Sequence, residues 1–302
     1  MKTERDTTPS AAAVPAPLPS RTVRRLVQAH RQLEGAGFVV RRPVPTVGLE
    51  QVEPFLMLDE MGPVTFGPGE AVGAPDHPHR GFETVTYVLE GEAQHEDSAG
   101  HRGTIGPGDV QWMTAGAGIV HSEEPSDALK RDGGRMHGFQ LWVNLPRRDK
   151  LMAPRYQELK AAQIPRATSA DGLAKVVVIA GEALGVSARI ETRTPILYQH
   201  WSLAPGARVS QPIDASFNGF VYVFRGAALV GDREVKDGQL AILSDGGAIE
   251  LSSAAGAELL LLAGQPLKEP LARYGPFVMN TQQELVDAFR DFEAGRLGAI
   301  AR

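Results

Sequence analysis

The chain has 302 residues, a length that excludes one small domain and suits about two domains, each long enough to bury its own core. Its net charge of −5 excludes an overall basic field that would hold a nucleic-acid backbone or an anionic bilayer. The absence of cysteine excludes disulfides, thiolate nucleophiles, iron–sulfur clusters and cysteine-type zinc sites, so any metal must bind imidazole nitrogen and carboxylate oxygen.

Residues 1–20 are mainly Ala, Pro, Ser and Thr, which offer almost nothing to bury, and this composition predicts a disordered leader. No later stretch reaches the roughly 18 apolar residues of a membrane helix. Polar residues follow Arg24 and Arg25, where a signal sequence would be apolar. We therefore expect a cytoplasmic protein that neither enters a membrane nor contacts nucleic acid directly.

Short apolar runs broken by Gly and Pro occupy the chain from about residue 37 onward, and they favour an all-β sandwich or barrel. The runs lie at 55–58, 84–89, 110–113, 139–143, 176–179, 196–203, 220–224, 240–243 and 258–262. Only the end of the chain has helical periodicity, where Thr281 and Glu284 form a capping box and Gly295 follows as a stop. The sequence thus predicts many strands and one short C-terminal helix over about 281–294.

The β-rich region also contains an internal repeat. The segment TVTYVLEG at 84–91 resembles GFVYVFRG at 219–226, and IGPGDVQWM at 105–113 resembles VKDGQLAIL at 235–243. A polar stretch near 146–154 separates the two copies. We predict two similar antiparallel β domains, residues 21–148 and residues 149–302.

Two pairs of candidate metal ligands stand out in the first copy. His77 and His79 are two residues apart, and so are His121 and Glu123. Since alternate residues of a strand face the same side, each pair can present both side chains to one face. If the two strands lie side by side, three imidazoles and one carboxylate converge on one point, which is a ligand set for a divalent ion.

The second copy serves as an internal control for this metal site. Its aligned positions hold Pro212, Asp214, Leu251 and Ser253. Because that set lacks the three imidazoles, we predict one metal per chain, held in the N-terminal domain. The C-terminal domain then serves as a scaffold, a lid or a partner surface.

Four blocks around these residues carry a family resemblance. They are DHPHRGFETVTYVLEGEAQHEDS at 76–98, GDVQWMTAGAGIVHSEEP at 108–125, LWVNLP at 141–146 and GPFVMNT at 275–281. Together they resemble the pirin family of the cupin superfamily. The resemblance implies two antiparallel jelly-roll (cupin) barrels packed together, with one Fe(II) in the N-terminal barrel. The family's ligands fall on His77, His79, His121 and Glu123.

The resemblance implies two functions, and the sequence leaves both open. One is an iron-dependent dioxygenase like quercetin 2,3-dioxygenase, which opens a flavonol with O2 and releases CO, with Glu123 as ligand and catalytic base. The other is a non-enzymatic, redox-sensing iron regulator that docks onto a transcription factor or a metabolic enzyme. Other divalent metals can compete for such a site. A third interpretation is that the metal has only a structural role. Trp112, Phe139 and Trp142 could wall a substrate cavity, although their strand setting favours ordinary core packing.

Overall fold

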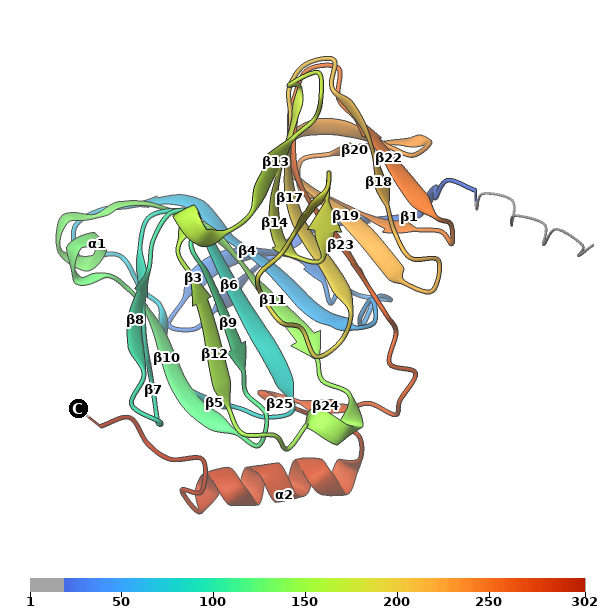
Figure 1. The fold of residues 1–302 in the computed structure, drawn as a ribbon. Helices are drawn as coiled ribbons and strands as arrows, with labels where there is room; N and C mark the ends of the chain where they lie inside the picture. The colour runs from blue at the N-terminus through green and yellow to red at the C-terminus, as the bar shows by residue number, and fades with distance from the viewer. Residues whose placement is uncertain (1–18, 302) are drawn as a thin grey trace, which may run out of the picture.

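The computed structural model describes residues 19–301, which form two β-barrels with a helix beneath the first (Figure 1). Of the leader predicted for residues 1–20, all but Pro19 and Ser20 lie outside the described residues. These two residues are already bonded to the second barrel. The Pro19 carbonyl accepts a 3.0 Å hydrogen bond from the Gly247 amide, and Ser20 forms a bridge with Ala248.

The first barrel consists of two antiparallel sheets. The larger sheet has seven strands in the order β12-β9-β6-β11-β4-β3-β2, and the smaller has four in the order β5-β10-β7-β8. The strands of the larger sheet are β2 (His30–Glu34), β3 (Phe38–Val44), β4 (Phe55–Phe66), β6 (Phe82–Glu90), β9 (Val110–Thr114), β11 (Gly134–Asn144) and β12 (Arg155–Leu159). Those of the smaller sheet are β5 (Ala74–His79), β7 (Ala93–Asp97), β8 (Arg102–Ile105) and β10 (Ile119–Pro125).

The second barrel is one branched antiparallel sheet of ten strands. Its main path runs β1-β21-β19-β23-β17-β14-β13, and β18, β20 and β22 branch from it. The main-path strands are β1 (Val23–Gln28), β13 (Arg166–Thr168), β14 (Ala174–Ala180), β17 (Ile196–Leu203), β19 (Asn218–Val230), β21 (Gln239–Leu243) and β23 (Ala257–Gly264). The branches are β18 (Arg208–Pro212), β20 (Arg233–Lys236) and β22 (Ala248–Ser252). Two further pairs stand apart: β15 (Glu182–Ala183) with β16 (Val186–Ser187), and β24 (Ala272–Tyr274) with β25 (Phe277–Met279).

The helices are few and short. The first is α1 (Asp127–Asp132), and the last is α2 (Gln282–Glu293), with the 3-10 turns η1 (Arg147–Asp149) and η2 (Ala161–Gln163) between them. The predicted capping box is present at the start of α2, where the Thr281 side chain accepts from the Glu284 amide. The predicted fold, all-β in two antiparallel barrels with a short C-terminal helix, is confirmed. No helix within residues 19–301 is long and apolar enough to cross a membrane.

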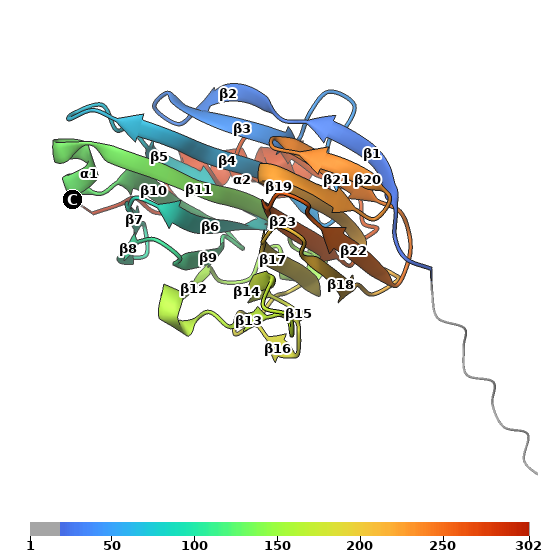
Figure 2. The same ribbon diagram turned by 90° about the horizontal axis from the view of Figure 1, so that it is seen from above.

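The two barrels pack through the outer faces of their long sheets (Figure 2). Strand β6 shows how alternation divides its side chains: Val85 and Tyr87 belong to the core shared by both barrels, whereas Thr86 lines the interior of the first. Aromatic rings bridge the shared core, with ring centroids 5.5 Å apart for Phe55 and Phe220. This packing fixes the first barrel's larger sheet and leaves its inner face free to carry polar groups.

The interior of the second barrel is mostly apolar, with Gln199 and Gln211 as buried polar exceptions. Its core cluster includes inward side chains of β17, β19, β22 and β23, namely Trp201, Leu203, Val221, Val223, Leu251, Leu259 and Leu261. Among the described residues, that barrel contributes no group of side chains able to share a metal ion. The four positions that align with the predicted metal ligands therefore lie in a domain whose interior is filled by packed side chains.

Three segments depart from the predicted domain boundaries of 21–148 and 149–302. Strand β1 pairs with β21 of the second barrel, and β12 pairs with β9 of the first. The segment around Phe277 bridges Arg80, and Phe277 joins Val120 and the buried face of α2 in one apolar cluster. The physical reason is that open sheet edges and apolar barrel ends need cover, which segments distant in sequence supply. The chain passes from the first sheet to the second between β12 and β13, after residue 159.

Candidate metal centre

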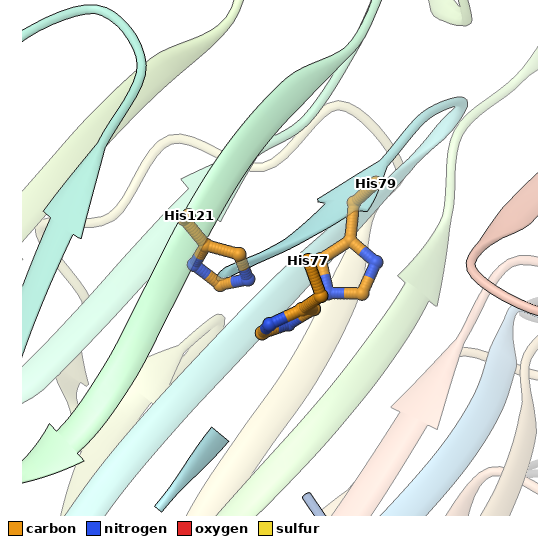
Figure 3. A group of neighbouring side chains, drawn as sticks. All are labelled: His77, His79 and His121. Carbon is orange, nitrogen blue, oxygen red and sulfur yellow. The ribbon is translucent and has the colours of Figure 1, made fainter. Parts of the chain in front are cut away.

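Three of the four predicted ligands meet inside the first barrel. His77 and His79 end strand β5, and the antiparallel register sets His77 opposite His121 of β10. The candidate ligand atoms of all three side chains lie within 4.8 Å of one another. Figure 3 shows the three rings turned toward one another, and their centroids are 4.4 to 4.9 Å apart. This arrangement follows from the two-residue spacing and from pairing of the two strands.

The hydrogen bonds of these imidazoles suit metal ligation. Nδ1 of His77 lies 2.7 Å from the Pro75 carbonyl oxygen, and Nδ1 of His79 lies 3.4 Å from that of Pro276. Because a carbonyl only accepts, each Nδ1 carries the proton and each Nε2 keeps its lone pair. Both ring nitrogens of His121 are buried and have no hydrogen-bond partner within residues 19–301. A buried imidazole in this state is suited to bind a metal ion.

The electrostatics keep two of the three rings neutral. Burial, followed by the nearby His121 and His77, lowers the pKa of His79 well below its usual value. Burial, followed by His77 and His95, does the same to the pKa of His121. At neutral pH these rings therefore offer lone pairs to a cation without first losing a proton.

Glu123, the fourth predicted ligand, points to a different set of partners. Its Oε1 accepts a 2.7 Å hydrogen bond from the Thr86 hydroxyl, and its Oε2 accepts a 2.6 Å bond from the Gln140 amide. Its oxygens are not among the ligand atoms that gather within 4.8 Å. The ladder between β10 and β5 shifts register between His121 and Glu123, so the simple two-residue alternation does not carry over to this side chain.

Two of the three histidines line a cavity of about 530 Å³ inside the first barrel. His77, His79 and Glu123 line it together with Thr86 and Gln140. Most of the remaining wall is apolar and comes from Phe38, Met57, Met61, Val64, Phe66, Val72, Met136 and Trp142. A cavity of this volume, mostly apolar with a few convergent polar groups, is typical of small-molecule sites.

The three aromatic residues singled out in the sequence divide between core and cavity. Trp112 and Phe139 are buried in the core shared by the barrels, as their strand setting indicated. Trp142 instead lines the cavity, where its ring lies 5.2 Å from that of His79 and 4.3 Å from that of Phe82.

Several residues of the cavity wall were not identified from the sequence. Thr86 and Gln140 were detectable as polar residues within apolar strand runs, TVTYVL and FQLWV. Arg42 and Arg273 carried no such signal, because each comes from a segment whose place in the barrel depends on long-range packing. Arg273 lies on β24, far along the chain from the other wall residues.

Comparison with known proteins agrees with this architecture. The family model described as Pirin matches residues 37–143, and the one described as Pirin C-terminal cupin domain matches residues 198–298. A pirin-like protein from Solanum lycopersicum is 44% identical over 283 residues, covering 92% of this chain and 93% of the relative. Pirin from Mus musculus is 44% identical over 286 residues, covering 92% of this chain and 94% of the relative.

A solved structure is also similar over nearly the whole chain. Quercetin 2,3-dioxygenase from Acinetobacter baumannii superposes with a TM-score of 0.88 at 37% identity, covering 94% of this chain and all of that protein. The similarity therefore extends across both barrels and the segments exchanged between them. With both domain models matched and relatives similar along nearly its full length, the chain belongs to the pirin family and has the two-barrel cupin fold.

Proposed function

We propose that this protein is a metal-dependent dioxygenase that opens the ring of a flavonol-type substrate with O2 and releases CO. The observation that carries the proposal is the group of three histidines, His77, His79 and His121, two of which, His77 and His79, line a largely apolar cavity of about 530 Å³. The similarity to a quercetin 2,3-dioxygenase at 37% identity supports the substrate class. Fe(II), one per chain, is the metal implied by the family resemblance.

A redox-active ion on the three imidazoles would supply the centre at which substrate oxygens and O2 meet. The chain's own residues perform the remaining tasks. Met57, Met61 and Trp142 exclude water and flank a planar ligand. Glu123, predicted as ligand and base, is oriented by Thr86 and Gln140, and these bonds leave each oxygen one further lone pair. We propose that one of these oxygens takes the proton of the flavonol hydroxyl.

The experiment is aerobic turnover of quercetin by anaerobically iron-loaded protein, followed by loss of flavonol absorbance and by detection of CO. Zinc-loaded protein is the control, because zinc does not change oxidation state. Turnover with iron and none with zinc supports the proposal. Iron-loaded protein that holds stoichiometric metal and releases no CO contradicts it.

The alternative, a redox-responsive docking protein, is favoured by the link between the metal strand and α2. Arg80, which follows His79, donates a 2.6 Å bond to the Ala117 carbonyl and a 2.8 Å bond to Asp291 of α2. The outer side of α2 exposes Val286 and Phe292. A change at the metal could thus alter an exposed surface. Hydrogen exchange of α2 in Fe(II)- and Fe(III)-loaded protein tests this, and identical protection in both states argues against it.

A further inference from the structure

The cavity wall contains two arginines that differ in their ion pairs. Arg273 forms no ion pair with any residue in the range 19–301, whereas the cavity's other arginine, Arg42, pairs with both Asp59 and Glu34. The other acids of the wall are Asp76, Glu123, which accepts hydrogen bonds from Thr86 and Gln140, and Glu124, which pairs with Lys130. Arg273 is therefore the cation in this wall that is available to a ligand.

Two contacts hold the Arg273 side chain in place. Its Nη1 donates a 3.0 Å hydrogen bond to the Leu56 carbonyl, and its guanidinium lies 5.0 Å from the centre of the Trp142 ring. These contacts use one N–H group and one face of the planar guanidinium, so its other N–H groups stay free to bind a ligand.

The surroundings also disfavour the charged form of the Arg273 side chain. Burial, followed by the positive charge of Arg42, lowers the pKa of Arg273, and only Asp59 among its neighbours opposes this. Asp59 is already engaged by Arg42 through two hydrogen bonds. An anion in the cavity would relieve this cost, and a planar carboxylate matches the guanidinium in a two-point hydrogen bond.

The position of Arg273 relative to the histidines defines what such a ligand looks like. The centroid of the Trp142 ring is 5.2 Å from that of His79, and the Arg273 guanidinium lies 5.0 Å from the Trp142 ring. The cationic group and one of the metal ligands therefore contact the same indole. A ligand that reaches both carries two polar ends joined by an apolar, ring-sized body.

We propose that the cavity selects aromatic ligands bearing a carboxylate in addition to the oxygens that face the histidines, and that Arg273 is the residue that recognises it. The assignment of the metal-facing end rests on the proposed function, whereas the carboxylate end rests on Arg273 alone. The physiological substrate class is accordingly an aromatic acid of flavonol size.

The test compares two probes, a flavonol and the same flavonol bearing a 4′-carboxylate, by titration calorimetry against zinc-loaded protein, in which no turnover occurs. We expect the wild-type protein to bind the carboxylate about tenfold or more tightly than the neutral probe, as befits a charge-assisted bond. Arg273→Gln keeps a donor for the Leu56 carbonyl but removes the charge. It should abolish this preference and leave the affinity for the neutral probe within about twofold. Arg273→Lys should retain part of the preference.

Arg148→Gln is the matched control, because Arg148 is 77% exposed and its ion pair is with its neighbour Asp149. Three results overturn the inference: no preference in the wild type, no binding of either probe, or equal weakening of both probes by Arg273→Gln. The proposed function fails separately. Iron-loaded protein that consumes neither flavonol refutes the dioxygenase, while a charge preference lost in Arg273→Gln would still establish the anion site.

Discussion

The Thr86 hydroxyl donates a 2.7 Å hydrogen bond to Oε1 of Glu123, joining two residues that lie on different sheets of the metal-binding barrel. The Gln140 amide donates to the other oxygen. Glu123 thus reaches from one sheet to the other, within the same cavity wall as His77 and His79.

We expect Glu123→Gln to keep the metal and to lower flavonol turnover by about 10²- to 10⁴-fold, the usual contribution of a general base. Metal content and CO release, measured on the same sample, check this. Glu124→Gln, whose parent carboxylate pairs with Lys130, is the control and should turn over normally. Loss of metal from Glu123→Gln would instead identify Glu123 as the fourth ligand.

Replacing His121 with Ala should abolish stoichiometric metal binding, because two imidazoles remain where three converge. We expect affinity to fall by more than about 100-fold, beyond the usual effect of losing a group that merely supports a ligand. Competition with a chromogenic chelator measures it. His101→Ala is the control, since its ring is 55% exposed and pairs with Asp97. Unchanged affinity in His121→Ala would refute the site.

The metal-free protein should lose stability on acidification. The unfolded chain takes up protons at His79 and His121 below about pH 6.5, whereas burial keeps these rings neutral in the folded state. Each histidine therefore lowers the free energy of unfolding by up to about 1.4 kcal/mol per pH unit below that value. Urea unfolding between pH 7 and pH 5 measures the slope. A double His79→Asn, His121→Asn variant with the same slope would contradict this origin.

Lys150 ties the metal strand to the C-terminal segment. Its buried Nζ donates to the Gly81 and Val278 carbonyls at 2.8 and 3.0 Å and to Asn144 at 2.7 Å, and burial lowers the pKa of Lys150 to about 7. Lys150→Met leaves these acceptors without a hydrogen-bond donor and should lower the free energy of unfolding by roughly 2 to 5 kcal/mol. Urea unfolding checks this, with the exposed Lys236→Met as control. A change below about 0.5 kcal/mol would show that water replaces the ammonium.

Much of the metal centre was predictable because the spacing of His77, His79 and His121 depends only on strand alternation. The two-fold repeat likewise predicted two barrels, since each copy forms the same local elements. The direction of the Glu123 side chain was not predictable, because a register shift after His121 is set by how two strands fit together. The place of Arg273 in the cavity wall was not predictable for the same kind of reason, since β24 reaches the cavity through packing between distant segments.

The domain boundary was harder still. Composition near 146–154 marks a polar stretch, but a polar stretch does not reveal which sheet edge a later strand will complete. Strand β12 pairs back with β9, and β1 crosses to β21, through backbone hydrogen bonds that any sequence can make.

The exchange of segments between the barrels also dictates the order in which the protein can be completed during its synthesis. Phe277 and Leu297 are translated after the entire second barrel, yet they cover Val120 beside His121. The preceding residue, Pro276, supplies the carbonyl that faces His79. A nascent chain therefore cannot cover this end of its metal barrel until the ribosome has passed Leu297, and an ion that arrives earlier meets the three histidines without this cover.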